Sequence, residues 1–152
     1  MPTTGRQIEP SASSSLAELS WFGVARNALA GWWPLARGYV ETALAEGPGD
    51  MAIDDVYRFL LSEHMQLWLL WFEGVRGAVV TEIAVYPRQK TCILRLFAAT
   101  DGLRSAWLPM LGVIEAWARE KECCAVEVIG RAGWRRLLPE YRQTHVILRR
   151  EL

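Results

Sequence analysis

The C-terminal part of the chain is the part that decides the fold. Residues 91–152 read TCILRLFAATDGLRSAWLPMLGVIEAWAREKECCAVEVIGRAGWRRLLPEYRQTHVILRREL. The β-type run Thr91–Ala98 predicts a strand, the amphipathic segment Ser105–Lys121 predicts a long helix, and the apolar run Cys124–Ile129 predicts a second strand. Because a helix connects the two strands, we expect them to pair in parallel through a right-handed crossover.

A polar turn, Ala99–Arg104, lies between the first strand and the helix. A strand that runs through a tight turn into a helix N-terminus directs backbone N–H groups and the positive end of the helix dipole toward one point. The turn is therefore expected to suit a phosphate-bearing ligand. A short helix over Arg131–Leu138 and a closing strand over Thr144–Arg149 are predicted to complete this part of the chain.

The first half of the chain predicts two helices followed by strands. The first helix lies within Leu16–Glu46, although Leu16–Leu29 is ambiguous between a strand and a short helix, and the second begins near Met51. A three-stranded antiparallel meander follows, over Gln66–Phe72, Ala78–Tyr86 and Lys90–Phe97. The predicted class is α/β (α+β), with a mixed central sheet flanked by helices. A flexible arm, residues 1–15, precedes a single domain over residues 16–152.

Composition limits the kinds of partner. The chain has 152 residues, of which 51% are hydrophobic and 22% charged, and its formal net charge is zero, so neither nucleic acid nor membrane is an expected obligatory partner. Charge is nevertheless uneven, because residues 131–152 hold six Arg and two Glu, a balance of +4. That basic end is the expected contact for an anionic ligand.

The chain has three cysteines, Cys92, Cys123 and Cys124. Their spacing is not that of metal ligands. Cys92 and Cys124 fall in apolar runs and are expected to be small core residues. A reducing cytoplasmic compartment fits these thiols, and no metal is expected.

Several short motifs, spread over residues 31–150, occur together in one known group of proteins. They are Asp54-Asp55-Val56, Gln66-Leu67-Trp68-Leu69, Val80-Thr81-Glu82-Ile83 with Tyr86-Pro87, Trp107-Leu108-Pro109, Glu115-Ala116-Trp117-Ala118-Arg119 and Gly130-Arg131-Ala132-Gly133-Trp134. Together with the order of helices and strands, they resemble small phage-encoded proteins of the GNAT acyltransferase fold. The resemblance implies acetyl-CoA or another acyl-CoA as cosubstrate and an amine as acceptor.

The resemblance also implies where the acyl-CoA pyrophosphate is held. In GNAT enzymes it lies on backbone amides of the loop that corresponds to Ala99–Ser105, so the expected contacts are Thr100, Asp101, Gly102, Leu103, Arg104 and Ser105. Here the loop departs from the family pattern, since Gly102 is its only glycine. Alternatively the loop is a simple helix start, capped by Thr100 or Asp101.

Two catalytic candidates follow from the same resemblance. Tyr141 is the counterpart of the tyrosine that protonates the departing thiolate; alternatively it packs the last helix onto the sheet. Glu82 is the candidate general base, because a carboxylate in an otherwise apolar strand is costly unless it is paired. The alternative is that Glu82 faces solvent.

The sequence leaves three functions open. The first is acyl transfer to an amine. The second is a non-catalytic structural or internal component of a phage virion, favoured by the incomplete loop and by eight tryptophans. In that case the arm and exposed Trp side chains contact other protein chains, and the location is the virion rather than the host cytoplasm. The third, a nucleic-acid-modifying relative, is disfavoured by the neutral net charge.

Overall fold

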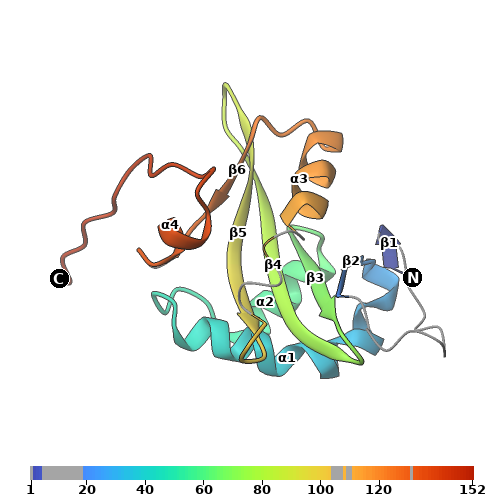
Figure 1. Cartoon of the computed structure of the whole chain (residues 1–152). Helices are drawn as coiled ribbons and strands as arrows, with labels where there is room; N and C mark the ends of the chain where they lie inside the picture. The colour runs from blue at the N-terminus through green and yellow to red at the C-terminus, as the bar shows by residue number, and fades with distance from the viewer. Residues whose placement is uncertain (1, 5–18, 104–107, 109–110, 131) are drawn as a thin grey trace.

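A mixed sheet with helices on both faces forms the centre of the molecule (Figure 1). The computed structural model describes residues 2–4, 19–103, 108, 111–130 and 132–152. Within these residues the sheet order is β1-β2-β3-β4-β5-β6, antiparallel throughout except for the parallel pair β5 and β6. The strands are β1 (Pro2–Thr4), β2 (Ser20–Val24), β3 (Met65–Trp71), β4 (Val75–Val85), β5 (Lys90–Ala99) and β6 (Ala125–Val128).

Helices cover the two faces of the sheet unequally. They are η1 (Arg26–Ala28), α1 (Leu29–Ala45), α2 (Ile53–Leu61), α3 (Leu111–Glu120) and α4 (Trp134–Leu137). On one face α1 packs against β4 and β5, and α2 packs against β3; this is called the α1 face below. The other face, called the α3 face, carries α3 and α4 (Figure 1). The predicted class, meander and parallel crossover are confirmed.

Apolar side chains form one core on each face. Strand β3 is apolar at almost every position because it is buried on both sides. Leu67 and Leu69 point to the α1 face, whereas Trp68 and Leu70 point to the α3 face. The ambiguous segment Leu16–Leu29 contains β2, which extends the meander on the far side of β3.

The first residues of the chain also belong to the sheet. Pro2–Thr4 pairs with β2 of the same chain, whereas residues 5–18 lie outside the described part. The expectation that the arm contributes to a subunit interface therefore stays a prediction. So does the division into an arm and a single domain.

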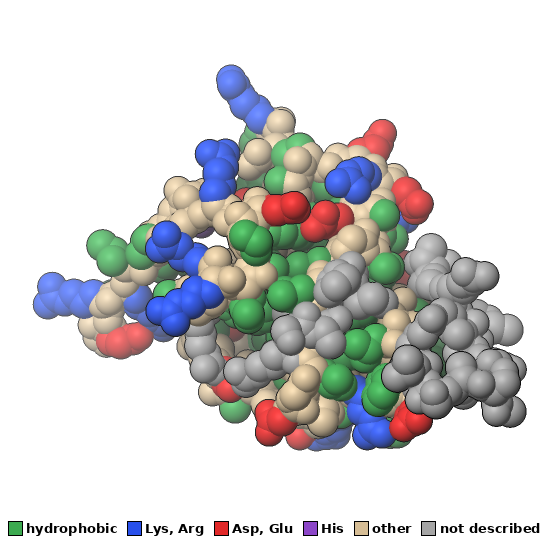
Figure 2. Space-filling model, in the orientation of Figure 1, with side chains coloured by type: hydrophobic (Ala, Val, Ile, Leu, Met, Phe, Trp, Pro, Cys, Tyr) green, Lys and Arg blue, Asp and Glu red, His purple; other side chains and the backbone are tan. Residues whose placement is uncertain are grey.

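The predicted closing strand Thr144–Arg149 is wrong. Residues 141–152 have no regular secondary structure, and Val146, Ile147 and Leu148 are exposed. In the space-filling view this segment projects from one side of the molecule and carries basic side chains (Figure 2). A strand needs a neighbouring edge for its backbone hydrogen bonds, and a cavity separates residues 144–147 from β6. The apolar pattern of Thr144–Arg149 is therefore not enough to make this segment a strand.

The expectation for two of the cysteines is only half correct. Cys92 is fully buried in β5 on the α3 face, as expected. Cys124 is exposed, because β6 begins only at Ala125 and Cys124 lies in the turn before it.

Helix α3 buries the expected side chains on the sheet. Leu111, Ile114 and Ala118 are buried, whereas Arg119 and Glu120 are exposed. The helix is described from Leu111 onward, so the predicted start at Ser105 and the side chain of Trp107 lie outside the described residues.

Replacing Leu111 with alanine should lower the free energy of unfolding by about 2–5 kcal/mol, because the side chain is buried and leaves a cavity. The neighbouring variant Gly112→Ala is the matched control. Gly112 is exposed and an added Cβ would touch nothing, so this variant should gain about 0.5–1 kcal/mol. Urea denaturation of both variants measures the difference, and equal midpoints would show that a different face of α3 is buried.

Candidate functional site

A gap opens in the sheet between β5 and β6. The two strands pair from Thr91 with Ala125 to Leu94 with Val128. One further bond follows, from the Ile129 N–H to the Leu94 carbonyl at 3.3 Å. Beyond it β5 continues to Ala99, whereas the other chain segment turns away toward α4. The second half of β5 therefore has β4 on one side and the gap on the other.

A bulge in β5 explains where the gap begins. The register with β4 shifts between Val80, which pairs with Leu96, and Thr81, which pairs with Leu94, so Arg95 is the extra residue. A bulge bends the strand that carries it. The last β5 residue paired with β6, Leu94, comes directly before this bend.

Backbone groups of β5 face the gap. The Thr100 N–H donates to the Arg76 carbonyl of β4 at 2.7 Å. Because backbone groups alternate in direction along a strand, those of Phe97 and Ala99 point away from β4 and toward the gap. The gap is therefore lined by a strand edge able to bind an extended ligand.

Two aromatic rings close the far end of the gap. The indole of Trp134 in α4 packs edge-on against Phe97, with ring centroids 5.4 Å apart. A Cβ added at Gly130 would lie 2.6 Å from Nε1 of Trp134. Gly130 is thus required for the chain to leave β6 and bring this tryptophan over β5.

The predicted phosphate loop lies at the end of β5. The Leu103 N–H donates to the Thr100 carbonyl at 3.2 Å, whereas the amides of Asp101 and Gly102 donate to no described residue. Gly102 has φ +85°, and an added Cβ there would meet nothing within 4 Å. Arg104 and Ser105 lie outside the described residues. Because α3 is described only from Leu111, both the phosphate site and the helix-cap alternative stay predictions.

The side chain of Thr100 has a structural partner. Its hydroxyl shares a hydrogen bond of 2.9 Å with the Tyr39 hydroxyl of α1, and Tyr39 also donates to the Val75 carbonyl at 3.2 Å. These contacts hold the end of β5 against α1. The Thr100 side chain therefore helps to hold the start of the loop against α1.

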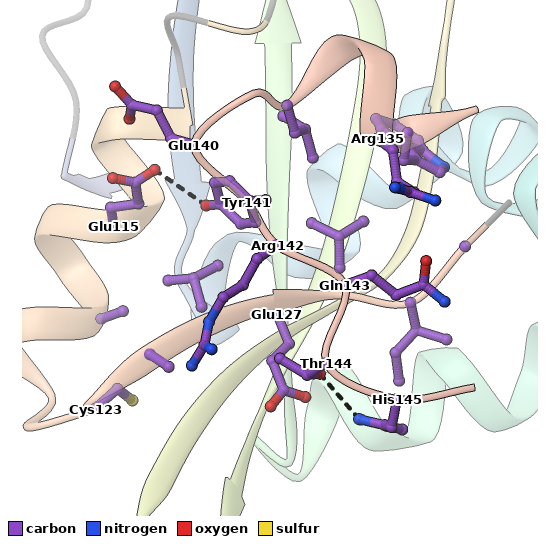
Figure 3. Close-up of a pocket in the computed structure, with 18 of the residues that line it drawn as sticks. Glu115, Cys123, Glu127, Arg135, Glu140, Tyr141, Arg142, Gln143, Thr144 and His145 are labelled. Carbon is purple, nitrogen blue, oxygen red and sulfur yellow. Dashed lines mark hydrogen bonds between the residues drawn. The ribbon is translucent and has the colours of Figure 1, made fainter. Parts of the chain in front are cut away.

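Tyr141 follows α4 in the chain and packs on the α3 face. Its side chain points toward Glu115 of α3 (Figure 3). Its hydroxyl donates to Oε1 of Glu115 at 3.0 Å. Burial raises the pKa of Tyr141 well above its usual range, and the Glu115 carboxylate raises it further. The phenol therefore keeps its proton over the physiological pH range.

A cavity of about 810 Å³ adjoins Tyr141. Its walls are α3, the outer edge of β6, α4 and residues 140–147 (Figure 3). Charged side chains of both signs line it, among them Arg119, Arg142 and Glu127. No group of three or more His, Cys, Asp or Glu in the described part of the chain could hold a metal ion.

Glu82 is partly buried and paired. Its carboxylate accepts a hydrogen bond from Arg95 at 2.9 Å, and Arg95 also reaches Asp50 at 3.0 Å. The side chains of Glu82 and Arg95 are 25% and 22% exposed, so Glu82 is a partly buried carboxylate with a partner, and its role as general base stays a prediction. Sequence reasoning missed Arg95 and Asp50, although a second charged residue in an apolar strand was a usable signal.

The two catalytic candidates lie on opposite faces of the sheet. In β4, Val80 belongs to the core of the α1 face and Val79 to that of the α3 face, so alternation places Glu82 on the α1 face. Tyr141 packs on the α3 face. A substrate would therefore reach both residues only through the gap between β5 and β6.

Two acids, the buried thiol of Cys92 and the partly buried phenol of Tyr141, should make the protein less stable at alkaline pH. Burial raises the pKa of the Cys92 thiol from 9.0 to about 12, and that of Tyr141 is raised from 10.0. Above pH 9 the unfolded chain releases protons that the folded chain retains, so the free energy of unfolding should fall as pH rises. Chemical denaturation between pH 8 and pH 11 (roughly the window set by these groups) measures the slope.

Cys92→Ala and Tyr141→Phe should each make that slope shallower, because each removes one of the two titrations. A slope that neither variant changes would contradict the assignment of the raised pKa values to these residues.

Comparisons with solved structures identify the fold. The sequence matches no protein-family model, and no curated protein is similar to it in sequence. AAC(6')-Iy in complex with the bisubstrate analogue CoA-S-monomethyl-acetylneamine is similar with a TM-score of 0.66 at 14% identity, covering 90% of this chain and 99% of that one.

Two further structures lead to the same result. The aminoglycoside 6'-N-acetyltransferase AAC(6')-Ih from Acinetobacter baumannii has a TM-score of 0.61 at 11% identity, over 89% of this chain and 99% of that one. A predicted acetyltransferase with acetyl-CoA from Clostridium acetobutylicum has a TM-score of 0.62 at 11% identity, over 89% and 96%. The chain therefore has the fold of the GNAT acetyltransferases.

Proposed function

We propose that the protein is an acyl-CoA-dependent N-acyltransferase. The observation that carries this proposal is the edge of β5 beyond Leu94, which no described strand pairs on the β6 side. Its backbone faces a gap that ends at a turn, where the amides of Asp101 and Gly102 donate to no described residue. The fold supports it, because solved acetyltransferases share this arrangement of strands and helices. The substrates of those proteins are not transferred to this chain by the likeness alone.

The described residues fit an acyl-CoA molecule. The amides of Asp101 and Gly102 would hold the pyrophosphate at the turn after β5. The backbone of Phe97 and Ala99 would bind the extended pantetheine arm as a strand edge binds a peptide. When bound, acyl-CoA supplies an activated acyl group on a thioester.

The two substrates, acyl-CoA and the acceptor amine, would bind on opposite faces of the sheet. Acyl-CoA would bind on the α3 face, where Leu103 of the turn and Tyr141 pack, and Tyr141 would donate its proton to the sulfur that leaves. The acceptor amine would approach from the α1 face, where Glu82 is the sequence candidate for taking its proton. Arg95 already occupies one oxygen of Glu82, so this role requires the second oxygen.

Isothermal titration of the full chain with acetyl-CoA tests the proposal. We expect one molecule to bind per chain, with competition by CoA. Absence of binding to both compounds at millimolar concentration would contradict the proposal, because that concentration corresponds to only about 4 kcal/mol of binding free energy.

A non-catalytic role, such as a component of a phage particle, is the second candidate. Two observations favour it: Trp134 and Phe97 occupy the far end of the gap, and Glu82 is tied to Arg95. Absence of acetyl-CoA binding combined with a stable oligomer in analytical ultracentrifugation would support this role instead.

A further inference from the structure

A second carboxylate lies on the α1 face at the entrance of the gap. Glu82 of β4 is opposite Ile93 of β5, and Ile93 is opposite Glu127 of β6. Val126 and Val128 belong to the α3 face, so alternation places Glu127 on the α1 face with Glu82. The two carboxylates therefore flank Ile93 in one row across the sheet, roughly 10 Å apart by strand spacing.

Glu127 differs from Glu82 in its surroundings. No described residue forms a hydrogen bond or an ion pair with its carboxylate, whereas Glu82 is bound by Arg95. Glu127 is partly buried and lines the 810 Å³ cavity (Figure 3). Within the described part of the chain both oxygens of this carboxylate can therefore accept hydrogen bonds from a ligand.

Glu127 lies at the point where β5 and β6 separate, and not within the hydrophobic core. It directly precedes Val128, which is the last β6 residue paired with β5. The main contacts of α1 are with β4 and β5, and those of α2 are with β3, so β6 lies beyond the part of the face that these helices cover. A ligand on the α1 face therefore has access to Glu127 at the point where the strands diverge.

We propose that Glu127 is the general base for the acceptor, and that the acceptor is a primary amine that enters as an ammonium ion over β6 on the α1 face. This inference rests on the proposed acyl transfer. Sequence reasoning chose Glu82 instead, because a carboxylate in a long apolar strand is conspicuous, whereas β6 is a short edge strand. The ammonium ion is the form that a carboxylate attracts before it removes the proton.

The proposed step balances as follows. A proton leaves the ammonium nitrogen for the Glu127 carboxylate, and the freed lone pair forms the new bond to the acyl carbon. The carbon–sulfur bond breaks with its electron pair on sulfur, and the sulfur takes the proton of Tyr141. The nitrogen of the new bond then releases its second proton to solvent, which leaves a neutral amide. Solvent also removes the proton from Glu127 and restores that of Tyr141, so the net change is the release of one proton and no oxidant or reductant is involved.

The matched variants Glu127→Gln and Glu82→Gln test the assignment. Each keeps the shape of the side chain and removes its ability to accept a proton. Thiol release from acetyl-CoA is measured with spermidine, sisomicin and a lysine-containing peptide as acceptors, together with acetyl-CoA affinity and the melting temperature. We expect Glu127→Gln to lower transfer by about 100-fold or more, as is usual for loss of a general base, without changing the affinity for acetyl-CoA.

The outcomes separate this inference from the proposed function. Transfer by Glu127→Gln within tenfold of the wild type, or a 100-fold loss in Glu82→Gln instead, would overturn the inference (about the scale of general-base effects). Acetyl-CoA binding by the wild type without transfer to any of the three amines would also overturn it, while leaving acyl-CoA binding intact. Absence of acetyl-CoA binding would defeat the proposed function itself. A folded, acetyl-CoA-binding Glu127→Gln variant that no longer transfers would support the inference.

Discussion

Replacing Trp68 with alanine should lower the free energy of unfolding by about 3–5 kcal/mol. The side chain is 2% exposed and packs edge-on against Trp117, with ring centroids 5.2 Å apart. It also rests on Gly23 of β2, where an added Cβ would lie 3.3 Å from the indole ring. Removing the indole therefore leaves a cavity where β2, β3 and α3 pack together.

A polar contact adds to this loss. Nε1 of Trp68 donates to Thr81 at 3.0 Å, and the Thr81 hydroxyl in turn donates to Gln66 at 2.9 Å. Thr81 is completely buried, so loss of the donor leaves an acceptor that water does not reach.

Thermal unfolding measures the effect. For a chain of 152 residues, the loss corresponds to a fall in melting temperature of about 6–20 °C. Trp68→Phe is the matched control, because it keeps an aromatic ring and removes the N–H group; it should cost less than the alanine variant. A change below about 1 kcal/mol in Trp68→Ala would show that the core of the α3 face is not packed around this residue.

Replacing Gly102 with valine should weaken acetyl-CoA binding by about 100-fold or more. In the proposed complex the amides of Asp101 and Gly102 bind the pyrophosphate, and a hydrogen bond to a charged group contributes about 1.5–3 kcal/mol. A branched side chain at this point would keep the phosphate away from both amides. Loss of two such bonds corresponds to the expected change in affinity.

Gly102→Ala separates blocked access from backbone strain. Gly102 has φ +85°, so any side chain there is strained, by about 1–2 kcal/mol in the left-handed region. Both variants carry that strain, but only valine has the bulk to cover the amides. Isothermal titration should therefore show a much larger loss for valine than for alanine, and equal affinities in all three proteins would place the ligand elsewhere.

Local sequence patterns were enough to predict the elements that lie in the core. The strand Gln66–Phe72, the meander and the apolar side of α3 follow from which residues can be buried, because burial of apolar surface dominates their energy. The parallel pairing of β5 with β6 also follows, since a helical connection returns the chain to the same edge of the sheet.

Patterns failed where the outcome depends on a partner elsewhere in the chain. Residues Thr144–Arg149 have the composition of a strand, but a cavity lies between residues 144–147 and the outer edge of β6, and they form no strand there. Likewise the sequence marked Glu82 as an unusual residue without showing that Arg95 and Asp50 bind it.

The sequence alone therefore determined the class of fold, the meander with the parallel strand that follows it, and the turn that contains Gly102. Only the tertiary structure decided that Glu82 and Tyr141 lie on opposite faces, and that Glu127 lies at the gap where no described side chain binds its carboxylate. The physical reason is that hydrophobic periodicity is set by neighbours along the chain, whereas the register of β4, β5 and β6 and the bulge at Arg95 are set by pairing between distant segments.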